Sequence, residues 1–280
     1  KYIDATIGAG GIAEAILKRG GEVLGIDQDP EALAITEERL KACPGILEKN
    51  EDTPNVLKLV RGNFSNLQKI AQVSGFAHVH GIVFDLGFAS FQVEDEKRGL
   101  SFQKQGPLDM RLDPSLGVTA EDLINLLSES QLSKLFTEYS DEPMSLAIAK
   151  AIVIKRKNLP IKTTSSLALI INEVYKHKNM NTKINPATKV FQALRIAVNS
   201  ELDNLSTALL QAVKLLNSQG RLVVVSFHSG EDRIVKAFFN EQEKQGILKI
   251  LTPKPIIPSL AEIQNNPRTR SAKLRAIEKI

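Results

Sequence analysis

The feature that most constrains this chain is a repeated alternation of short β-rich runs and helical segments over its first 90 residues. Four such runs occur there, at positions 2–5, 22–27, 56–61 and 81–86. Parallel strands cannot be joined by a tight turn and need a crossover connection, which is usually a helix. The alternation therefore predicts a parallel sheet with helices packed against it.

The helix after the second run has a clear start signal. Asp29 is a good N-cap, Pro30 suits the first helical position, and Glu31 lies near the positive end of the helix dipole. We therefore expect a helix that begins at Pro30. Ser229, with acidic residues in the turn that follows it, is expected to cap a later helix in the same way.

Strand signals stop between residues 106 and 186, where apolar residues recur at helical spacing. Beyond this region we expect a long amphipathic helix at 187–216 and a buried strand at 220–227. An antiparallel hairpin is expected to follow, with its strands at 247–251 and 273–277. The sequence thus predicts an α/β domain of residues 1–105 and 187–280, with a helical insertion of residues 106–186.

Composition limits where such a protein works and which chemistry it uses. No apolar run approaches the roughly 20 residues of a membrane-spanning helix, and the first residues lack the features of a signal peptide. We therefore expect a cytoplasmic protein, trimmed at its N-terminus because it opens without methionine inside an apolar stretch. One cysteine, Cys43, and four scattered histidines form no ligand cluster, so no metal is expected. A net charge of +4 permits a nucleic-acid partner.

A glycine-rich loop follows the first β-rich run. Gly8, Gly10 and Gly11 lie where a strand turns into a helix, so backbone N–H groups can approach a ligand closely. With Ala13 the loop matches the fingerprint of dinucleotide enzymes, and Asp27 lies at about the spacing expected for a ribose-binding acid. A nicotinamide-dependent dehydrogenase must therefore be considered.

Asp4 separates this interpretation from another one. It ends the first β-rich run, four residues before Gly8. A carboxylate there repels a pyrophosphate but attracts the ammonium and sulfonium groups of S-adenosylmethionine. The electrostatics favour the methyl donor.

Three later residues are candidates for the same site. The two oxygens of Asp27 can accept both ribose hydroxyls, although a loop acid that helps to cap the next helix is the alternative. Phe64 follows the third run and can contact adenine or belong to the core. Asp85 ends the fourth run, where ligands bind in open parallel sheets, so we expect a functional carboxylate there.

Six segments carry a resemblance to one protein family. They are DLGFASFQ at 85–92, RGLSF at 98–102, GPLDMR at 106–111, TKVFQALRIAVN at 188–199, SFHSGEDRIVK at 226–236 and NPRTRSAKLR at 266–275. On these motifs the chain closely resembles the bacterial 16S ribosomal RNA cytosine-N4 methyltransferases, the MraW family.

The resemblance implies a Rossmann-like, seven-stranded S-adenosylmethionine-dependent methyltransferase fold with an inserted helical domain that recognises the substrate. It also implies S-adenosyl-L-methionine as cofactor and 16S ribosomal RNA of the small ribosomal subunit as partner, with neither a membrane nor a metal. By matching positions, the donor would contact Gly10, Gly11, Ile12, Asp27, Phe64, Asp85 and Gln92. The family usually has His where this chain has Ile12, whose backbone N–H can still serve.

The resemblance also names a chemical problem. The exocyclic nitrogen of cytosine is a poor nucleophile because its lone pair is delocalised into the ring, so a catalyst must orient the amine and accept its proton. We expect Asp85 to be that catalytic acceptor, with Gln92 shaping the pocket, although a backbone carbonyl could accept the proton instead. Asp109 and His228 are second candidates, although Asp109 can simply pair with Arg111 and His228 can be an ordinary core histidine.

Basic residues near the C-terminus are the expected RNA contacts. They are Arg268, Arg270, Lys273 and Arg275, together with Arg195 on the long helix. A solvated surface is the alternative for these charges. Two other functions also stay open, an RNA-binding protein with a degenerate donor site and a nicotinamide-dependent dehydrogenase.

Overall fold

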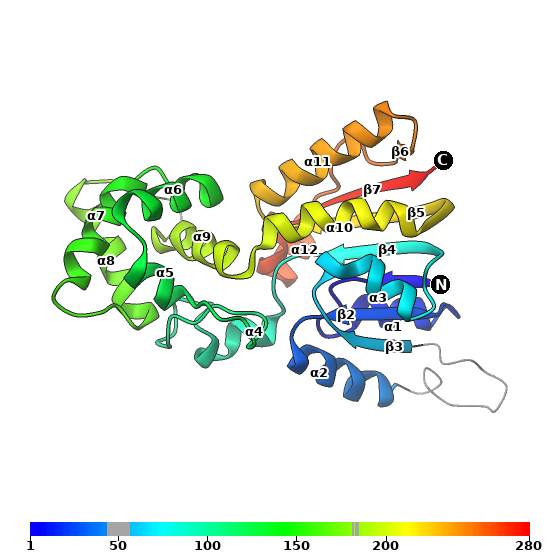
Figure 1. Ribbon diagram of the computed structural model, residues 1–280, viewed down its shortest axis with the longest axis horizontal. Helices are drawn as coiled ribbons and strands as arrows, with labels where there is room; N and C mark the ends of the chain where they lie inside the picture. The colour runs from blue at the N-terminus through cyan, green and yellow to red at the C-terminus, as the bar shows by residue number, and fades with distance from the viewer. Residues whose placement is uncertain (44–56, 181, 183–184) are drawn as a thin grey trace. The chain divides into compact units, whose positions relative to one another are not determined.

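The computed structural model describes residues 1–43, 57–180, 182 and 185–280. In that part of the chain seven strands form one sheet (Figure 1). They are β1 (Tyr2–Asp4), β2 (Val23–Asp27), β3 (Leu57–Arg61), β4 (Val79–Asp85), β5 (Leu216–Ser226), β6 (Leu248–Ile250) and β7 (Lys273–Lys279). Their order across the sheet is β3-β2-β1-β4-β5-β7-β6. Position 56, where the third strand was expected to begin, lies outside the described residues.

The strand directions bring several functional candidates to one edge of the sheet. Five neighbouring strands, β3, β2, β1, β4 and β5, are parallel, and β7 pairs antiparallel with both β5 and β6. Asp85, the last residue of β4, lies opposite Val225, and Ser226 lies opposite Lys273 at the start of β7. We call this side, where the parallel strands end, the carboxyl edge. The predicted seven-stranded Rossmann-like α/β fold is confirmed, including its last antiparallel hairpin.

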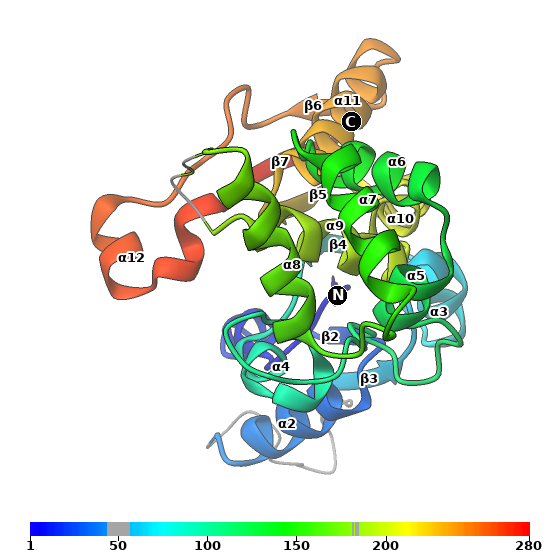
Figure 2. The same cartoon turned by 90° about the vertical axis from the view of Figure 1, so that its left-hand side faces the viewer.

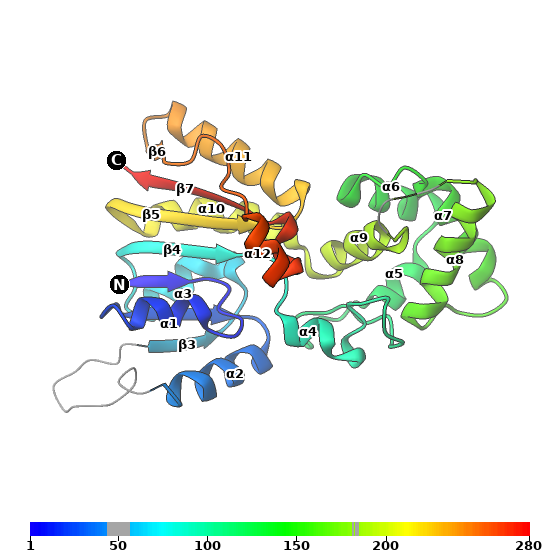
Figure 3. The ribbon, with the colours of Figure 1, turned by 180° about the vertical axis from the view of Figure 1, so that it is seen from behind.

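Helices cover both faces of the sheet (Figures 1 and 3). One face packs against α3 (Leu67–Val73), α10 (Glu201–Leu215) and α11 (Ser229–Lys244), and the other against α1 (Gly11–Leu17) and α2 (Pro30–Lys41). Phe84 and Leu222 are fully buried on the first face, and burial of a side chain of this size contributes roughly 1.5–3 kcal/mol. As predicted, α2 begins at Pro30, because the Asp29 side chain accepts the N–H of Glu31 at 3.0 Å. The strands therefore hold their carboxyl ends in a rigid framework.

The chain divides into two compact units, residues 1–87 with 202–280 and residues 88–201. The second unit is helical (Figure 2) and contains α4 (Ser90–Glu94), η2 (Glu96–Arg98), α5 (Ala120–Leu126), α6 (Glu129–Ser140), α7 (Ser145–Arg156), α8 (Thr164–His177) and α9 (Ala187–Asn199). It is longer at both ends than the expected insertion of residues 106–186. Phe102 and Phe191 explain the difference, because their rings pack together at 5.3 Å in the core of the helical unit.

The long helix expected over 187–216 is wrong, because the structure contains two helices there. α9 ends at Asn199, and Ser200 adopts a left-handed conformation with φ +50° before α10 begins. The Asn199 side chain accepts the N–H of Leu112 and donates to the carbonyl of Met110, both at 2.8 Å. These bonds hold the end of α9 against a loop far away in the sequence, so the chain bends although its apolar pattern continues. Within the described residues, none of the helices is long and apolar enough to cross a membrane.

Candidate functional site

The loop between β1 and α1 is held in place by side chains from β2 and α2. The N–H of Gly8 donates to Asp27 Oδ2 at 3.0 Å, and Thr36 Oγ1 donates to the carbonyl of Gly8 at 2.7 Å. Gly10 has φ +78°, and a Cβ there would lie 2.8 Å from Thr36 Cγ2. Gly11 opens α1 and is exposed. The loop is therefore rigid, and its glycines keep the start of α1 bare of side chains.

The same loop is also tied to β4. The N–H of Asp85 donates to Thr6 Oγ1 at 2.7 Å. Asp4 lies beneath the loop with 1% of its surface exposed. Burial raises the pKa of Asp4 to about 7, repulsion from Asp85 and Asp27 adds to the rise, and the N–H of Thr6 opposes it. A buried carboxylate cannot contact a ligand, so the charge of Asp4 acts on the site through space.

Asp27 organises the tip of β2. Its Oδ1 accepts the N–H of Asp29 at 3.0 Å, while Oδ2 accepts the bond from Gly8. Burial raises the pKa of Asp27, although these two bonds oppose the rise. Each carboxylate oxygen has a second lone pair, so ribose hydroxyls can still bind there. Both interpretations made from the sequence are compatible with this arrangement, since the loop acid is also a possible ribose ligand.

Phe64 begins the 3₁₀ turn η1 (Phe64–Asn66) that follows β3. Its half-buried ring meets Phe84 edge to face, with the ring centres 5.6 Å apart. Nearby, Asn63 Nδ2 donates to Gln28 Oε1 at 2.8 Å and links the tips of β2 and β3. Sequence reasoning missed this polar pair, whose signal is that Gln28 directly follows β2 and Asn63 lies two residues after β3. Adenine contact by Phe64 stays a prediction.

Asp85 ends β4 at the carboxyl edge and keeps an exposed surface. The surrounding protein removes part of the water from its carboxylate and raises its pKa to about 6, and repulsion from Glu231 adds to the rise. Sequence reasoning missed the influence of Glu231, which lies 146 positions further along the chain. The carboxylate of Asp85 is thus exposed and has a pKa close to neutral pH.

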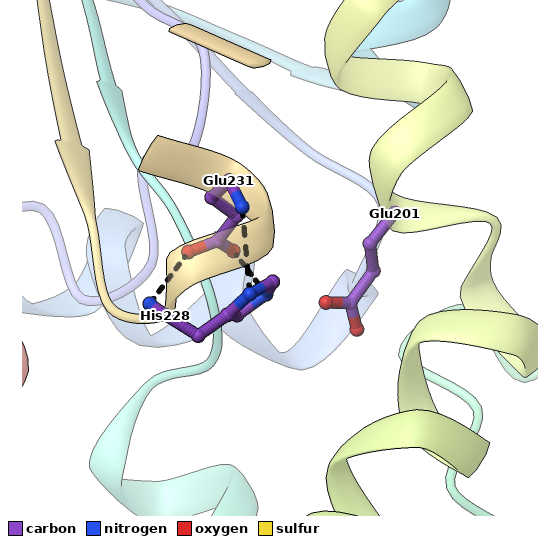
Figure 4. Close-up of side chains that lie close together, drawn as sticks. All are labelled: Glu201, His228 and Glu231. Carbon is purple, nitrogen blue, oxygen red and sulfur yellow. Dashed lines mark hydrogen bonds and ion pairs between the residues drawn. The ribbon is translucent and has the colours of Figure 1, made fainter. Parts of the chain in front are cut away.

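Glu231 and His228 form a compact turn at the start of α11 (Figure 4). The expectation that Ser229 caps this helix is wrong, because the cap is His228, whose Nδ1 accepts the N–H of Glu231 at 3.4 Å. Glu231 Oε2 accepts the N–H of Phe227 at 2.8 Å, and its exposed fraction is 2%. Figure 4 also draws Glu201, which accepts bonds from Arg195 at 2.8 and 2.9 Å. His228 is therefore a capping residue.

Ile12 follows the glycine loop in the first turn of α1. With Ile16 of α1 it lines a cavity of about 570 Å³ over the sheet, whose other walls include Tyr2, Val83 and Val223. An apolar side chain placed there offers a donor molecule no hydrogen bond. The backbone N–H of Ile12, in the first turn of α1, is the group that remains available for binding.

Comparison with known proteins settles the family. The model of the MraW methylase family matches residues 1–280. The chain belongs to this family. It is 46% identical over 298 residues to the ribosomal RNA small subunit methyltransferase H of Thermomicrobium roseum, covering 100% of this chain and 88% of that protein. The protein of the same name from Picosynechococcus is 44% identical over 279 residues, covering 99% and 89%. The resemblance identified from the sequence motifs is confirmed.

Gln92 and Asp109 belong to family motifs and lie in the helical unit. Gln92 is buried there, and its Oε1 accepts the N–H of Ala89 at 2.8 Å. Contact between Gln92 and the donor stays a prediction. Asp109 is paired with Arg111 at 2.7 and 2.8 Å, and although burial acts in the opposite direction, these bonds lower the pKa of Asp109. The ion pair named as its alternative role is therefore present.

The four basic residues near the C-terminus fall into two pairs. Arg275 Nε and Lys273 Nζ donate to the two oxygens of Asp232, at 2.7 and 3.0 Å. Arg275 is also buried, with 7% of its surface exposed. Arg268 and Arg270 lie instead in η3 (Pro267–Ser271), and both are exposed. The charges on β7 thus serve the structure of this MraW-family chain, whereas those on η3 face solvent.

Proposed function

We propose that this chain transfers a methyl group from S-adenosyl-L-methionine to the N4 amine of a cytidine in 16S ribosomal RNA of the small ribosomal subunit. The observation that carries the proposal is the carboxyl edge, where a clamped glycine loop and Asp85 are joined by the 2.7 Å bond to Thr6. The relatives' name supports a substrate in small-subunit ribosomal RNA. Since that RNA is the substrate, we infer that the protein works in the cytoplasm.

The residues of the glycine loop fit the donor. Gly10 adopts a left-handed φ of +78° and packs against Thr36, which fixes the turn into α1, and the amides of Gly11 and Ile12 lie at a helix start, which attracts a carboxylate. Asp27 accepts the ribose hydroxyls, and Phe64 contacts the adenine. When bound, the donor supplies a methyl group activated by a positively charged sulfur.

Electrostatics separate the methyl donor from a nicotinamide cofactor. Asp27 and Asp85 lie close enough to Asp4 that their negative charges add to the rise in its pKa, whose main cause is burial. Their negative potential stabilises a sulfonium and an ammonium, and it destabilises a pyrophosphate. The alternative of a dehydrogenase is therefore disfavoured.

Asp85 is the residue that handles the proton. With a pKa of about 6, its carboxylate is mostly ionised at pH 7 and can still accept a proton from the target amine. Because the Asp85 side chain is exposed, a cytosine ring can approach it. Burial raises the pKa of Asp85, and repulsion from Glu231, which holds the neighbouring turn through the N–H of Phe227, adds to the rise.

Methyl transfer to small ribosomal subunits from cells that lack the modification tests the proposal. Product nucleosides are resolved by mass spectrometry against N4-methylcytidine and C5-methylcytidine standards, and N4-methylcytidine is expected. A C5-methyl product would contradict the amine mechanism. Calorimetry with S-adenosylhomocysteine and with NAD completes the test. Binding of NAD alone would indicate a dehydrogenase. If neither molecule binds, the donor site is degenerate.

A further inference from the structure

The segment between β6 and β7, residues 251–272, forms an arm that returns to the sheet at the carboxyl edge. It contains α12 (Leu260–Asn265) and η3, and it joins β7 at Lys273, opposite Ser226. Figure 3 shows it entering β7 at the end of the sheet where the arrowheads of β4 and β5 lie. Since Asp85 and Lys273 belong to strands two places apart, their backbones lie roughly 10 Å apart. The arm therefore ends close to the proposed catalytic carboxylate.

The surface of the arm is uncovered and basic. Ile257 and Leu260 have 67% and 80% of their surface exposed. The cations of the arm, Lys254, Arg268 and Arg270, are also exposed. Among its residues the single carboxylate is Glu262, which accepts bonds from the Ser259 N–H and Oγ at 2.7 and 2.9 Å and so caps α12. The arm thus presents positive charge that its own carboxylate does not neutralise.

Neighbouring cations on β7 behave differently. Lys273 and Arg275 share Asp232, and this pairing places their charges against α11. The guanidinium groups of Arg268 and Arg270 are exposed, and among the described residues Arg270 has no carboxylate partner. Because guanidinium binds phosphate with several N–H donors at once, two such groups in a short turn suit a phosphodiester chain.

We propose that the β6–β7 arm is the surface on which the RNA strand beside the target cytidine docks, with Arg268 and Arg270 contacting its phosphates. The inference rests on the proposed function, because a cytidine held at Asp85 forces its flanking strand to leave across the carboxyl edge. According to this proposal the arm contacts the RNA, whereas Lys273 and Arg275, which were also expected to do so from the sequence, do not. The charge of the arm selects a polyanion over an apolar protein partner.

The test compares two double variants of the whole chain. Arg268→Gln with Arg270→Gln removes the proposed contacts. Lys214→Gln with Lys244→Gln removes two exposed charges from the ends of α10 and α11, at the opposite edge of the sheet. Binding of a labelled, single-stranded, cytidine-containing 16S RNA fragment is measured by fluorescence anisotropy over a series of salt concentrations.

The arginine variant should flatten the plot of log affinity against log salt by about 1.4, at about 0.7 for each lost phosphate contact. When salt is lowered from 1 M to 0.1 M, the gain in affinity of the arginine variant should be about 25-fold smaller than the gain of the wild type. The lysine variant and Lys273→Gln should keep the wild-type slope. An unchanged slope in the arginine variant overturns the proposal, and so does an equal change in the lysine variant.

Failure of the arm and failure of the proposed function give different results. If the wild-type chain methylates small subunits while the arginine variant keeps its salt slope, the arm is refuted and the function stands. If the slope changes as expected but no methyl group is transferred, the arm stands and the function is refuted. Thermal stabilisation by S-adenosylhomocysteine, measured in both variants, shows that the fold and the donor site are intact.

Discussion

Alanine at Gly10 should destabilise the chain, whereas alanine at the neighbouring Gly11 should not. The left-handed φ of +78° at Gly10 costs a residue with a Cβ about 1–2 kcal/mol. The new methyl group would also lie 2.8 Å from Thr36 Cγ2, and overpacking of this kind costs about 1–3 kcal/mol. Together the two effects lower the free energy of unfolding by roughly 2–5 kcal/mol.

Gly11 is a matched control one residue away. Its backbone does not have a positive φ, and the nearest atom to an added Cβ is Arg39 Nη1 at 3.9 Å. Alanine there restricts the unfolded chain without a clash, so we expect a gain of about 0.4–1 kcal/mol. The two substitutions are chemically identical and differ in the sign of their effect.

Urea unfolding followed by far-UV circular dichroism measures both variants, since the chain has no tryptophan to report by fluorescence. Calorimetry with S-adenosylhomocysteine then tests the site. Gly10→Ala should lose affinity because the loop moves, and Gly11→Ala should lose affinity only if the donor approaches its backbone closely. The reasoning is refuted if both variants are equally stable, since the strained φ and the Thr36 contact would then cost nothing.

Three further predictions concern the acids of the carboxyl edge. Asp85→Asn keeps the shape but removes the charged acceptor, so single-turnover methyl transfer should fall by about 10²- to 10⁴-fold, while affinity for S-adenosylhomocysteine falls far less; undiminished transfer would remove Asp85 from catalysis. Because the pKa of Asp4 rises to about 7 on folding, the folded state binds more protons than the unfolded state between about pH 4 and pH 7, so stability falls as pH rises through this range. From about pH 4 to pH 7, the free energy of unfolding of the wild type should therefore fall by up to about 4 kcal/mol more than that of Asp4→Asn, as measured by urea titration at each pH. Parallel curves of unfolding free energy against pH would contradict the burial argument. Glu231→Gln removes the repulsion that raises the pKa of Asp85, so the acid limb of the single-turnover pH profile should move to lower pH, and an unmoved limb would show that the two carboxylates do not interact.

Several features of this protein depend on residues close together in the chain and were therefore predictable from sequence. Alternating strands and helices determined the parallel sheet, and the Asp29–Pro30 signal determined where α2 begins. The glycine loop and Asp85 could be placed at strand ends, because a strand ends where its apolar run ends. Patterns of this kind report the local conformation of the backbone and which face of an element is buried.

Tertiary structure decided what those residues do. Ser200 breaks a continuous apolar pattern because Asn199 is bound by a loop 87 residues earlier in the chain. Arg275 is a structural residue because β7 returns it to Asp232, 43 positions away. Likewise, Glu231 raises the pKa of Asp85 only because β4 and β5 are neighbours in the sheet. Charge and hydrogen bonding act over a few ångströms in space, and proximity between distant residues arises from the folded arrangement.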